Sequence, residues 1–358
     1  MKQKKVASLG ATESRVVAVD LFCGAGGLSH GLQKAGVPVV AGFDLDADCK
    51  FAVETNNGAP FIHADVATLQ ASEIEPLFPT KALRVLAGCA PCQPFSRYAR
   101  AGSGDNEKWG LLSHFLRLAL ELRPAVLTME NVPELDRAGV FAHFVDVLRQ
   151  RGYSVTCSRV FCPDYGIPQQ RTRLVLFASL YGDITIEPPT RDPEQYSTVS
   201  TAISGLRALE AGGMDPLDPL HRCCRLTQVN MERISRSRPG GCWRDWPIHL
   251  RAQCHRNKSG ETYPSVYGRM AWDTPSPTIT TQFFGYGNGR FGHPNQNRAI
   301  SLREGAILQS FPLTYLFTAP ADKPSFAKLG RMIGNAVPVR LGEIVGNSIV
   351  KHLEGVTA

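Results

Sequence analysis

Two cysteines lie three residues apart in the segment 88–96, GCAPCQPFS, with a proline on either side of the second one. A Cys-x-x-Cys pair is typical of redox centres and of half zinc sites, whereas a single activated thiolate serves as a nucleophile. A redox pair is expected to open a helix, which Pro94 and the polar residues after Ser96 disfavour. The chain has no second Cys-x-x-Cys to complete a zinc site with Cys89 and Cys92. The spacing alone leaves open a nucleophilic role for one of these thiols.

A glycine-rich segment, DLFCGAGGLSHG at 20–31, follows one expected strand and opens one expected helix. Glycines permit a tight turn and close approach of a ligand to the backbone, and a helix N-terminus offers free N–H groups. The spacing of Gly24, Gly26 and Gly27 differs from the dinucleotide pattern G-x-G-x-x-G. A purely structural turn is therefore an alternative to a ligand-binding one.

Three aspartates follow successive expected strands. Asp44 and Asp46 come after the second strand, where doubly wound sheets commonly place a carboxylate that binds ribose hydroxyls. Asp65 comes after the third strand, where it could accept a hydrogen bond from an adenine amino group. A single aspartate at such a position is commonly a surface or capping residue. Three aspartates at successive strand ends favour the binding of a cofactor that contains a nucleoside.

The elements that must position these residues alternate along the first half of the chain. Short β-rich segments alternate with amphipathic ones, which predicts an α/β fold with a parallel sheet and crossover helices. The expected strands are 16–21, 39–43, 60–63, 84–87, 125–129, 154–160 and 173–178. The expected helices are 27–35, 46–56, 111–121 and 140–151, followed near the C-terminus by 302–309, 326–331 and 339–351.

Residues 187–296 have a different composition, rich in proline, glycine and arginine and without clear periodicity, which predicts a second domain or a large insertion. Within it, 222–269 holds ten basic and three acidic residues, so its excess of +7 equals the net charge of the whole chain. Arginine suits phosphates because its guanidinium is planar and bidentate, although a solvated surface is the alternative. The cysteines and histidines here follow no standard zinc spacing, so we predict no metal.

Composition restricts the class of protein. The chain has 358 residues, of which 43% are hydrophobic and 20% charged, so a sizeable core is expected. It has no apolar run of about 18 residues and no signal-peptide pattern at its start, and its ten cysteines do not suggest a disulfide scaffold. We therefore predict a cytoplasmic protein, associated with the nucleoid when bound to DNA, and no membrane partner.

The segment 88–96 resembles the catalytic motif of the DNA (cytosine-5)-methyltransferases of bacterial type. Five further segments resemble motifs of that family, and all six occur in the family's order between residues 20 and 338. They are DLFCGAGG at 20–27, MENV at 129–132, QQRTR at 169–173, RAISLREGAILQSFP at 298–312 and GNAVP at 334–338. The variable region also lies where the family has its target-recognition domain.

The resemblance implies a Rossmann-like S-adenosylmethionine-dependent methyltransferase domain, with a mostly parallel sheet and helices on both faces, and a second, smaller target-recognition domain. We expect 1–186 and 297–358 to form the catalytic and cofactor-binding domain, to which the C-terminal helices return. We expect 187–296 to form the target-recognition domain.

The resemblance also implies the reaction. Cys92 would attack carbon 6 of cytosine, so that carbon 5 takes the methyl group from the sulfonium of the cofactor. Glu130 would hold N3 and the exocyclic amine, and Arg171 and Arg173 would supply positive charge near the carbonyl and near Glu130. Cys89 would be a small buried neighbour. A base within a duplex cannot reach such a pocket and must be flipped out.

The same resemblance implies a set of cofactor-binding residues, drawn from the glycine-rich turn, the strand ends, the residue before Cys92 and the GNAVP motif. They are Phe22, Gly24, Gly26, Gly27, Leu28, Asp44, Asp65, Val66, Pro91, Asn335 and Val337.

For DNA we expect a polar, glycine-bearing loop at 97–110 to close over the substrate, a linker being the alternative. Trp243, Trp246 and Tyr263 could touch DNA, but packing of the small domain is favoured. The residues predicted to bind DNA are Ser96, Arg97, Arg236, Arg238, Arg244 and Arg269.

We therefore predict a methyltransferase that acts as a monomer on a specific double-stranded DNA sequence, either alone or paired with a separately encoded restriction endonuclease. Alternatives are a tRNA cytosine-5 methyltransferase, a DNA-binding relative without catalysis, and a thiol oxidoreductase. The Cys-Phe-Thr signature of the tRNA branch is absent from the recognition region. The joint presence of Cys92, Glu130, Arg171 and Arg173 disfavours an inactive relative.

Overall fold

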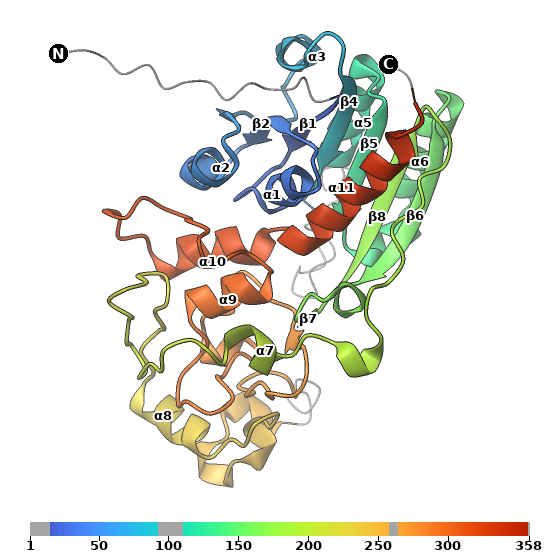
Figure 1. Ribbon diagram of the computed structural model, residues 1–358. Coiled ribbons are helices and arrows are strands. Elements are labelled where there is room, and N and C mark those ends of the chain that lie inside the picture. The colour runs from blue at the N-terminus through green and yellow to red at the C-terminus, as the bar shows by residue number, and fades with distance from the viewer. Residues whose placement is uncertain (1–14, 92–109, 258–263, 357–358) are drawn as a thin grey trace, which may run out of the picture.

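A seven-stranded sheet forms the centre of the computed structural model, which describes residues 15–91, 110–257 and 264–356 (Figure 1). Its strand order is β3-β2-β1-β4-β5-β8-β6. The neighbours from β3 to β5 are parallel, while β8 runs antiparallel to both β5 and β6. The strands are β1 (Val16–Leu21), β2 (Val39–Asp44), β3 (Phe61–His63), β4 (Leu83–Gly88), β5 (Val126–Asn131), β6 (Ser154–Phe161) and β8 (Thr172–Ser179).

Helices cover both faces of this sheet. Alternate residues of β1 explain why, since Val16 and Ala18 belong to one buried cluster and Val17 and Val19 to another. The first cluster includes apolar residues of α1 (Gly27–Lys34), α2 (Lys50–Asn57) and α11 (Val339–Leu353). The second includes those of α3 (Ala71–Ile74), α5 (Gly110–Leu122) and α6 (Gly139–Gln150).

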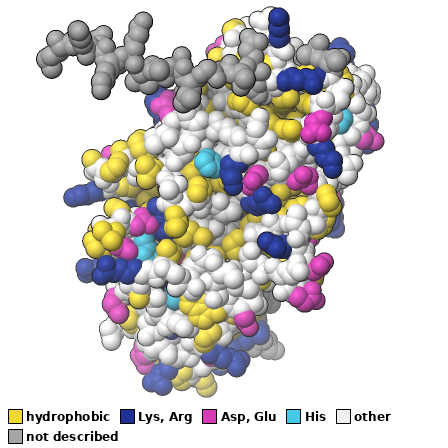
Figure 2. Space-filling view, in the orientation of Figure 1, with side chains coloured by type: hydrophobic (Ala, Val, Ile, Leu, Met, Phe, Trp, Pro, Cys, Tyr) yellow, Lys and Arg dark blue, Asp and Glu magenta, His cyan; other side chains and the backbone are white. Residues whose placement is uncertain are grey.

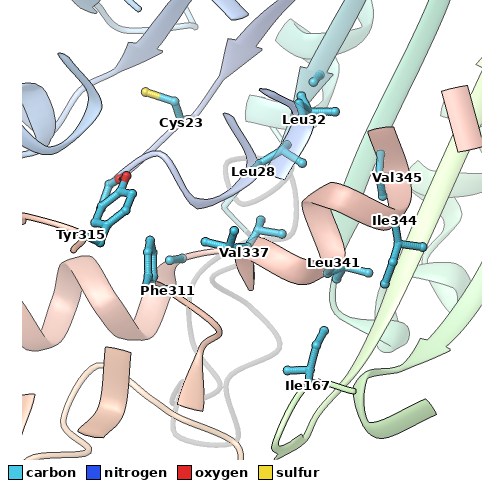
Figure 3. Close-up of a cluster of buried hydrophobic side chains, with 14 of the residues drawn as sticks. Cys23, Leu28, Leu32, Ile167, Phe311, Tyr315, Val337, Leu341, Ile344 and Val345 are labelled. Carbon is cyan, nitrogen blue, oxygen red and sulfur yellow. The ribbon is translucent and has the colours of Figure 1, made fainter. Parts of the chain in front are cut away.

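The C-terminal helix α11 packs directly on α1, the helix of the glycine-rich segment (Figure 3). Glycine permits this approach, because a Cβ on Gly31 would lie 2.3 Å from the carbonyl oxygen of Val339. A Cβ on Gly27 would lie 2.2 Å from the carbonyl oxygen of Val337. The backbone at the start of α11 is therefore in direct contact with the backbone of α1.

The remaining elements lie below the sheet in Figure 1. A short parallel pair joins β7 (Gln169–Gln170) to β9 (Ser276–Pro277). Trp243 and Trp246 are buried in a separate apolar cluster with Ile234 and Tyr286, so both indoles pack the interior as favoured above. Tyr263 lies outside the described residues. The helices here are α7 (Val199–Ile203), α8 (Gln228–Ser235), α9 (Leu302–Leu308) and α10 (Phe326–Asn335).

Short 3-10 helices complete the described ranges. They are η1 (Ala47–Cys49), η2 (Glu75–Leu77), η4 (Pro133–Arg137), η5 (Cys162–Tyr165), η6 (Pro193–Gln195), η7 (Trp243–Asp245), η8 (Ile248–Leu250), η9 (Gln253–Arg256) and η11 (Tyr286–Asn288).

A buried ionic cluster holds the start of α9. The guanidinium of Arg298 donates to both carboxylate oxygens of Glu304, at 2.7 Å each. His293 lies beside Glu304, and its Nδ1 accepts backbone N–H groups of Asn295 and Gln296 at 3.2 and 2.9 Å. Burial lowers the pKa of His293 to about 4, so its ring is neutral near pH 7.

The predicted strands and helices are confirmed, with shifts of a few residues at their ends. The segment predicted as a helix at 46–56 begins as the 3-10 helix η1 and becomes the α-helix α2 at Lys50. Strand β5 runs to Asn131, so the carboxylate of Glu130 projects from a buried strand. The antiparallel direction of β8 and the pairing of β7 with β9 were not foreseen, because each depends on contact between distant segments.

Candidate active site

A cavity of about 540 Å³ lies at the carboxyl ends of β1, β2, β4 and β5. Ligands of open α/β sheets bind at this edge. Its wall combines the turn after β1, the ends of β4 and β5, Arg171 and Arg173, residues 278–281 and the GNAVP motif. Segments from both halves of the sequence therefore meet around one space.

The glycine-rich segment forms the tight turn that its glycines predict, although its first residue with positive φ is not a glycine. Phe22, Gly24 and Gly26 all have positive φ, at 59°, 51° and 81°. The turn is held by Asp44, whose Oδ2 accepts the N–H of Gly24 at 2.8 Å while Oδ1 accepts the N–H of Asp46 at 2.8 Å. The carboxylate that sequence analysis assigned to a ribose thus also shapes the turn.

Asp20 is a feature of this cavity that sequence analysis missed. Its carboxyl is fully buried, with Oδ2 accepting the Ser29 hydroxyl at 2.6 Å and Oδ1 lacking a hydrogen-bond partner in the described structure. Burial raises the pKa of Asp20 to about 7, although the Ser29 hydrogen bond opposes the rise. A buried acceptor without a partner costs free energy, so this oxygen is suited to a donor supplied by a ligand.

The C-terminal segment completes the cavity through specific contacts. Tyr315 donates its hydroxyl to the carbonyl of Ala25 in the glycine-rich turn, at 2.5 Å. Gln309 donates to the carbonyl of Ile333 at 2.9 Å and so orients the segment before Asn335 and Val337, which line the cavity. The conformation of the turn therefore depends on residues almost 300 positions away.

Glu130 is held from two sides at the other end of the cavity. Its side chain is only 4% exposed, and its Oε1 lies 2.6 Å from Nε of Arg173. Its Oε2 accepts the thiol of Cys89 at 2.9 Å. Arg171 lies nearby, and its Nη1 donates to the carbonyl of Ile279 at 3.3 Å. Burial, assisted by the charge of Arg173, lowers the pKa of Arg171 to about 10, so it stays positively charged at neutral pH.

The segment that leads to Cys92 is anchored next to Glu130. Pro91 lines the cavity, and the carbonyl of Ala90 accepts the side-chain amide of Asn131 at 3.1 Å. Cys92, Ser96, Arg97 and the loop 97–110, except for its last residue, lie outside the described residues. Their roles remain predictions.

The residues predicted to bind the cofactor divide into two groups. Those that line the cavity are Phe22, Gly24, Leu28, Asp44, Pro91, Asn335 and Val337. Gly26 and Gly27 instead face Asn57 and the backbone of Val337, where they permit close packing. Asp65 and Val66 are also outside the lining: Val66 is buried, and Asp65 is exposed with its Oδ1 accepting the N–H of Ala67 at 2.9 Å.

Two walls of the cavity were not expected from the sequence. Residues 278–281 line it, because β9 pairs with β7 beside Arg171. A Cβ on Gly334 would lie 2.4 Å from the backbone of Thr280, which explains the glycine of GNAVP. Arg331 lines the cavity too, and its Nη2 lies 2.8 Å from Oδ2 of Asp46. No local periodicity marks these residues, so only proximity reveals them.

The arginines predicted to bind DNA differ in exposure. Arg236, Arg238 and Arg244 are exposed at and beyond the end of α8, and Figure 2 shows Lys and Arg side chains gathered at that lower end of the molecule. Arg269 is only 4% exposed, and donates to the carbonyls of Ile234 and other residues of the interior. The prediction for Arg269 is wrong, because its guanidinium is occupied inside the fold.

The described residues contain neither a metal-binding cluster nor a membrane-spanning helix. Within residues 15–91, 110–257 and 264–356, no group of three His, Cys, Asp or Glu side chains could hold a metal ion. None of the helices in these ranges is long and apolar enough to cross a membrane.

Comparison with solved structures defines the class of the fold. A DNA modification methyltransferase encoded within a prophage of E. coli superimposes with a TM-score of 0.71 at 22% identity, covering 95% of this chain and 99% of that one. The Dnmt2 methyltransferase of S. pombe gives a TM-score of 0.59 at 18% identity, covering 96% and 100%. The predicted fold class, a Rossmann-like methyltransferase, is thereby confirmed.

Sequence comparison then shows the family. The model of the C-5 cytosine-specific DNA methylases matches residues 16–351. The Type II methylase M.HgiDII of Herpetosiphon aurantiacus is 52% identical over 340 residues, which cover 94% of this chain and 96% of that protein. The Type II methyltransferase M.Eco47II of Escherichia coli is 30% identical over 344 residues, covering 94% and 79%. The chain belongs to the C-5 cytosine-specific DNA methylases and is a DNA cytosine-5-methyltransferase, as predicted.

Proposed function

We propose that the cavity binds S-adenosylmethionine, the methyl donor that methyltransferases of this family use. Its acidic end suits such a ligand, because Asp44 and Asp46 follow β2 and Asp20 has an unsatisfied buried oxygen. Phe22, Gly24 and Leu28 would contact it from the turn, and Asn335 and Val337 from the opposite wall. The sulfonium supplies an electrophilic methyl group.

We propose that Asp65 and Val66 also belong to the cofactor site. They follow β3 at the same edge of the sheet as Asp44, although they lie outside the cavity lining. Gly26 and Gly27 act in this proposal by shaping the turn rather than by touching the ligand.

We propose that methyl transfer proceeds through covalent catalysis by Cys92. Its thiolate sulfur bonds to carbon 6 of cytosine while the carboxyl group of Glu130 supplies a proton to N3. Carbon 5 would then take the methyl group as the bond between that group and the cofactor sulfur breaks. Return of the N3 proton to Glu130, loss of the carbon-5 proton to solvent and departure of the thiolate would restore the ring. Arg173 orients Glu130, and Arg171 adds positive charge beside it.

One observation carries this proposal. Glu130 and Arg173 line the same cavity as the glycine-rich turn and Asn335, directly beside the segment that leads to Cys92. A proton donor, positive charge and a methyl-donor site in one space are what the reaction requires.

The substrate is double-stranded DNA in this proposal, with the target cytosine flipped into the cavity. Arg236, Arg238 and Arg244 would contact the backbone or base edges, together with Ser96 and Arg97. Residues 187–296 would form the target-recognition domain, and 1–186 with 297–358 the catalytic one. The names of the relatives favour a restriction–modification system with a separately encoded endonuclease. We further propose that the protein acts as a monomer in the cytoplasm.

The test is trapping on a duplex that contains 5-fluorocytosine in its target site. Fluorine cannot leave as the proton does, so the wild-type protein with S-adenosylmethionine is expected to stay covalently bound to the DNA. Cys92→Ser is expected to form no adduct, and a tRNA offered in parallel is expected to remain unmethylated. An adduct formed equally well by Cys92→Ser would refute the proposal. Bisulfite sequencing of DNA from expressing cells identifies the target duplex beforehand.

A further inference from the structure

The side chain of Cys89 is only partly exposed, and its thiol contacts the carboxylate of Glu130. Cys89 follows β4 directly, while Glu130 lies near the end of β5, and the two strands are neighbours in the sheet. Sγ of Cys89 lies 2.9 Å from Oε2 of Glu130, and Nε of Arg173 lies 2.6 Å from Oε1. Oε2 therefore accepts a hydrogen bond from the thiol, while Oε1 is held by its ion pair with Arg173 and accepts no hydrogen bond from the residues that the structure describes. The two contacts together restrict rotation of the carboxylate about its last bond.

The thiol of Cys89 is kept in its donor form. Burial raises the pKa of Cys89 well above its usual range, and the adjacent Glu130 carboxylate raises it further. A protonated thiol is a weak hydrogen-bond donor and a poor nucleophile. Cys89 therefore does not compete with Cys92 as a nucleophile, although the two residues form one Cys-x-x-Cys pair in the sequence.

A second contact joins the same two segments. The side-chain amide of Asn131 donates to the carbonyl of Ala90, at 3.1 Å. Adjacent residues of one segment, Cys89 and Ala90, are thus bonded to adjacent residues of the other, Glu130 and Asn131. This pairing sets the start of the Cys92 segment relative to the carboxylate.

We propose that Cys89 is a positioning residue for Glu130, whose thiol hydrogen bond aligns the carboxyl group with the cytosine ring. The inference rests on the proposed role of Glu130 as the proton donor to N3. Each oxygen keeps a further site for the base, which can carry the proton that N3 takes or accept a hydrogen bond from the exocyclic amine. Without the thiol, Arg173 alone holds the group, and the carboxyl samples orientations that are unproductive.

The experiment compares Cys89→Ala, which lacks a donor, with Cys89→Ser, which keeps one. Cys89→Ala is expected to lower kcat roughly tenfold, a minor share of the 10²–10⁴ that a positioned proton donor contributes. Its KM for DNA is expected to stay within about twofold of wild type, since the lost contact is internal. Cys89→Ser is expected to recover most of kcat. Cys157→Ala is the matched control, because Cys157 is an exposed cysteine on β6 outside the cavity.

A double-mutant cycle separates positioning from simple loss of packing. In a Glu130→Gln background, Cys89→Ala is expected to lower the residual kcat by less than twofold, because the group that it positions is already altered. An equal tenfold loss in both backgrounds, or unchanged kcat in Cys89→Ala, would overturn the inference. Thermal unfolding is measured for every variant, and Cys89→Val serves as a second donor-free variant if Cys89→Ala does not fold.

Failure of the underlying function would give a different result. If Glu130→Gln alone kept normal kcat, the proposed role of Glu130 would be wrong whatever Cys89 does. If Glu130→Gln is impaired but Cys89→Ala is not, only the inference about Cys89 fails.

Discussion

Replacement of Gly31 by alanine tests how α11 is held against α1. A Cβ at this position would meet three backbone atoms of the C-terminal helix. They are the carbonyl oxygen of Val339 at 2.3 Å, the nitrogen of Glu343 at 2.5 Å and the carbonyl carbon of Gly342 at 2.5 Å. None of these atoms can rotate away as a side chain would, so the two helices must separate by about 1 Å to restore ordinary van der Waals contact.

The expected change in the free energy of unfolding of Gly31→Ala is the sum of two opposing contributions. Overpacking of a tight interior contact costs about 1–3 kcal/mol, and a clash with backbone belongs at the upper end. Alanine is the better helix former, which returns about 1 kcal/mol in α1. We therefore expect the free energy of unfolding of Gly31→Ala to fall by about 2 kcal/mol, which corresponds to a fall in Tm of roughly 3 °C for a chain of 358 residues. The KM for S-adenosylmethionine should also rise several-fold, because Val337 precedes α11 and lines the cavity.

The assay is denaturant unfolding together with steady-state methylation at varied cofactor concentration. The matched control is Gly139→Ala at the start of α6, where an added Cβ meets no atom within 4 Å. That variant should be as stable as wild type or slightly more stable, with unchanged KM. If Gly31→Ala behaved like Gly139→Ala, the close crossing of the two helices would not constrain the fold, and the reasoning would be refuted.

Four further outcomes are expected. Glu130→Gln should lower kcat about 10²–10⁴-fold with little change in DNA affinity, and a normal rate would exclude its role as proton donor. Between about pH 6.5 and pH 4, His293 binds a proton in the unfolded chain but stays neutral in the folded protein, because burial lowers its pKa to about 4. This difference should reduce the free energy of unfolding by about 3 kcal/mol as pH falls over that range. His293→Gln should flatten the dependence in urea titrations, and an unchanged slope would contradict the assigned burial. Arg269→Met should destabilise the fold by roughly 3 kcal/mol in the same titrations, since it removes buried hydrogen bonds. Arg236→Ala should instead keep Tm and weaken DNA binding, and the dependence of affinity on salt concentration should fall by the amount expected for about one phosphate contact. Unchanged binding at all salt concentrations would show that Arg236 does not contact DNA.

Much of the fold follows from local sequence pattern. The continuous apolar run of β1 and the glycines after it predict a buried strand, a tight turn and a helix, because those depend on neighbours in the chain. Asp44, which ends β2, and Glu130, near the end of β5, are brought to one edge of the sheet as soon as the strands are parallel. The sequence could therefore predict the class of fold, the family to which the chain belongs and most of the residues that line the cavity.

Other features were decided only by tertiary structure. The burial of Arg269, the unsatisfied oxygen of Asp20, the contact of Cys89 with Glu130 and the approach of Thr280 to Gly334 each join segments that packing brings together. An arginine within a basic segment has the same local pattern whether it faces DNA or the interior. Its role depends on which carbonyls surround it, and that is set by the packing of the whole chain rather than by periodicity along it.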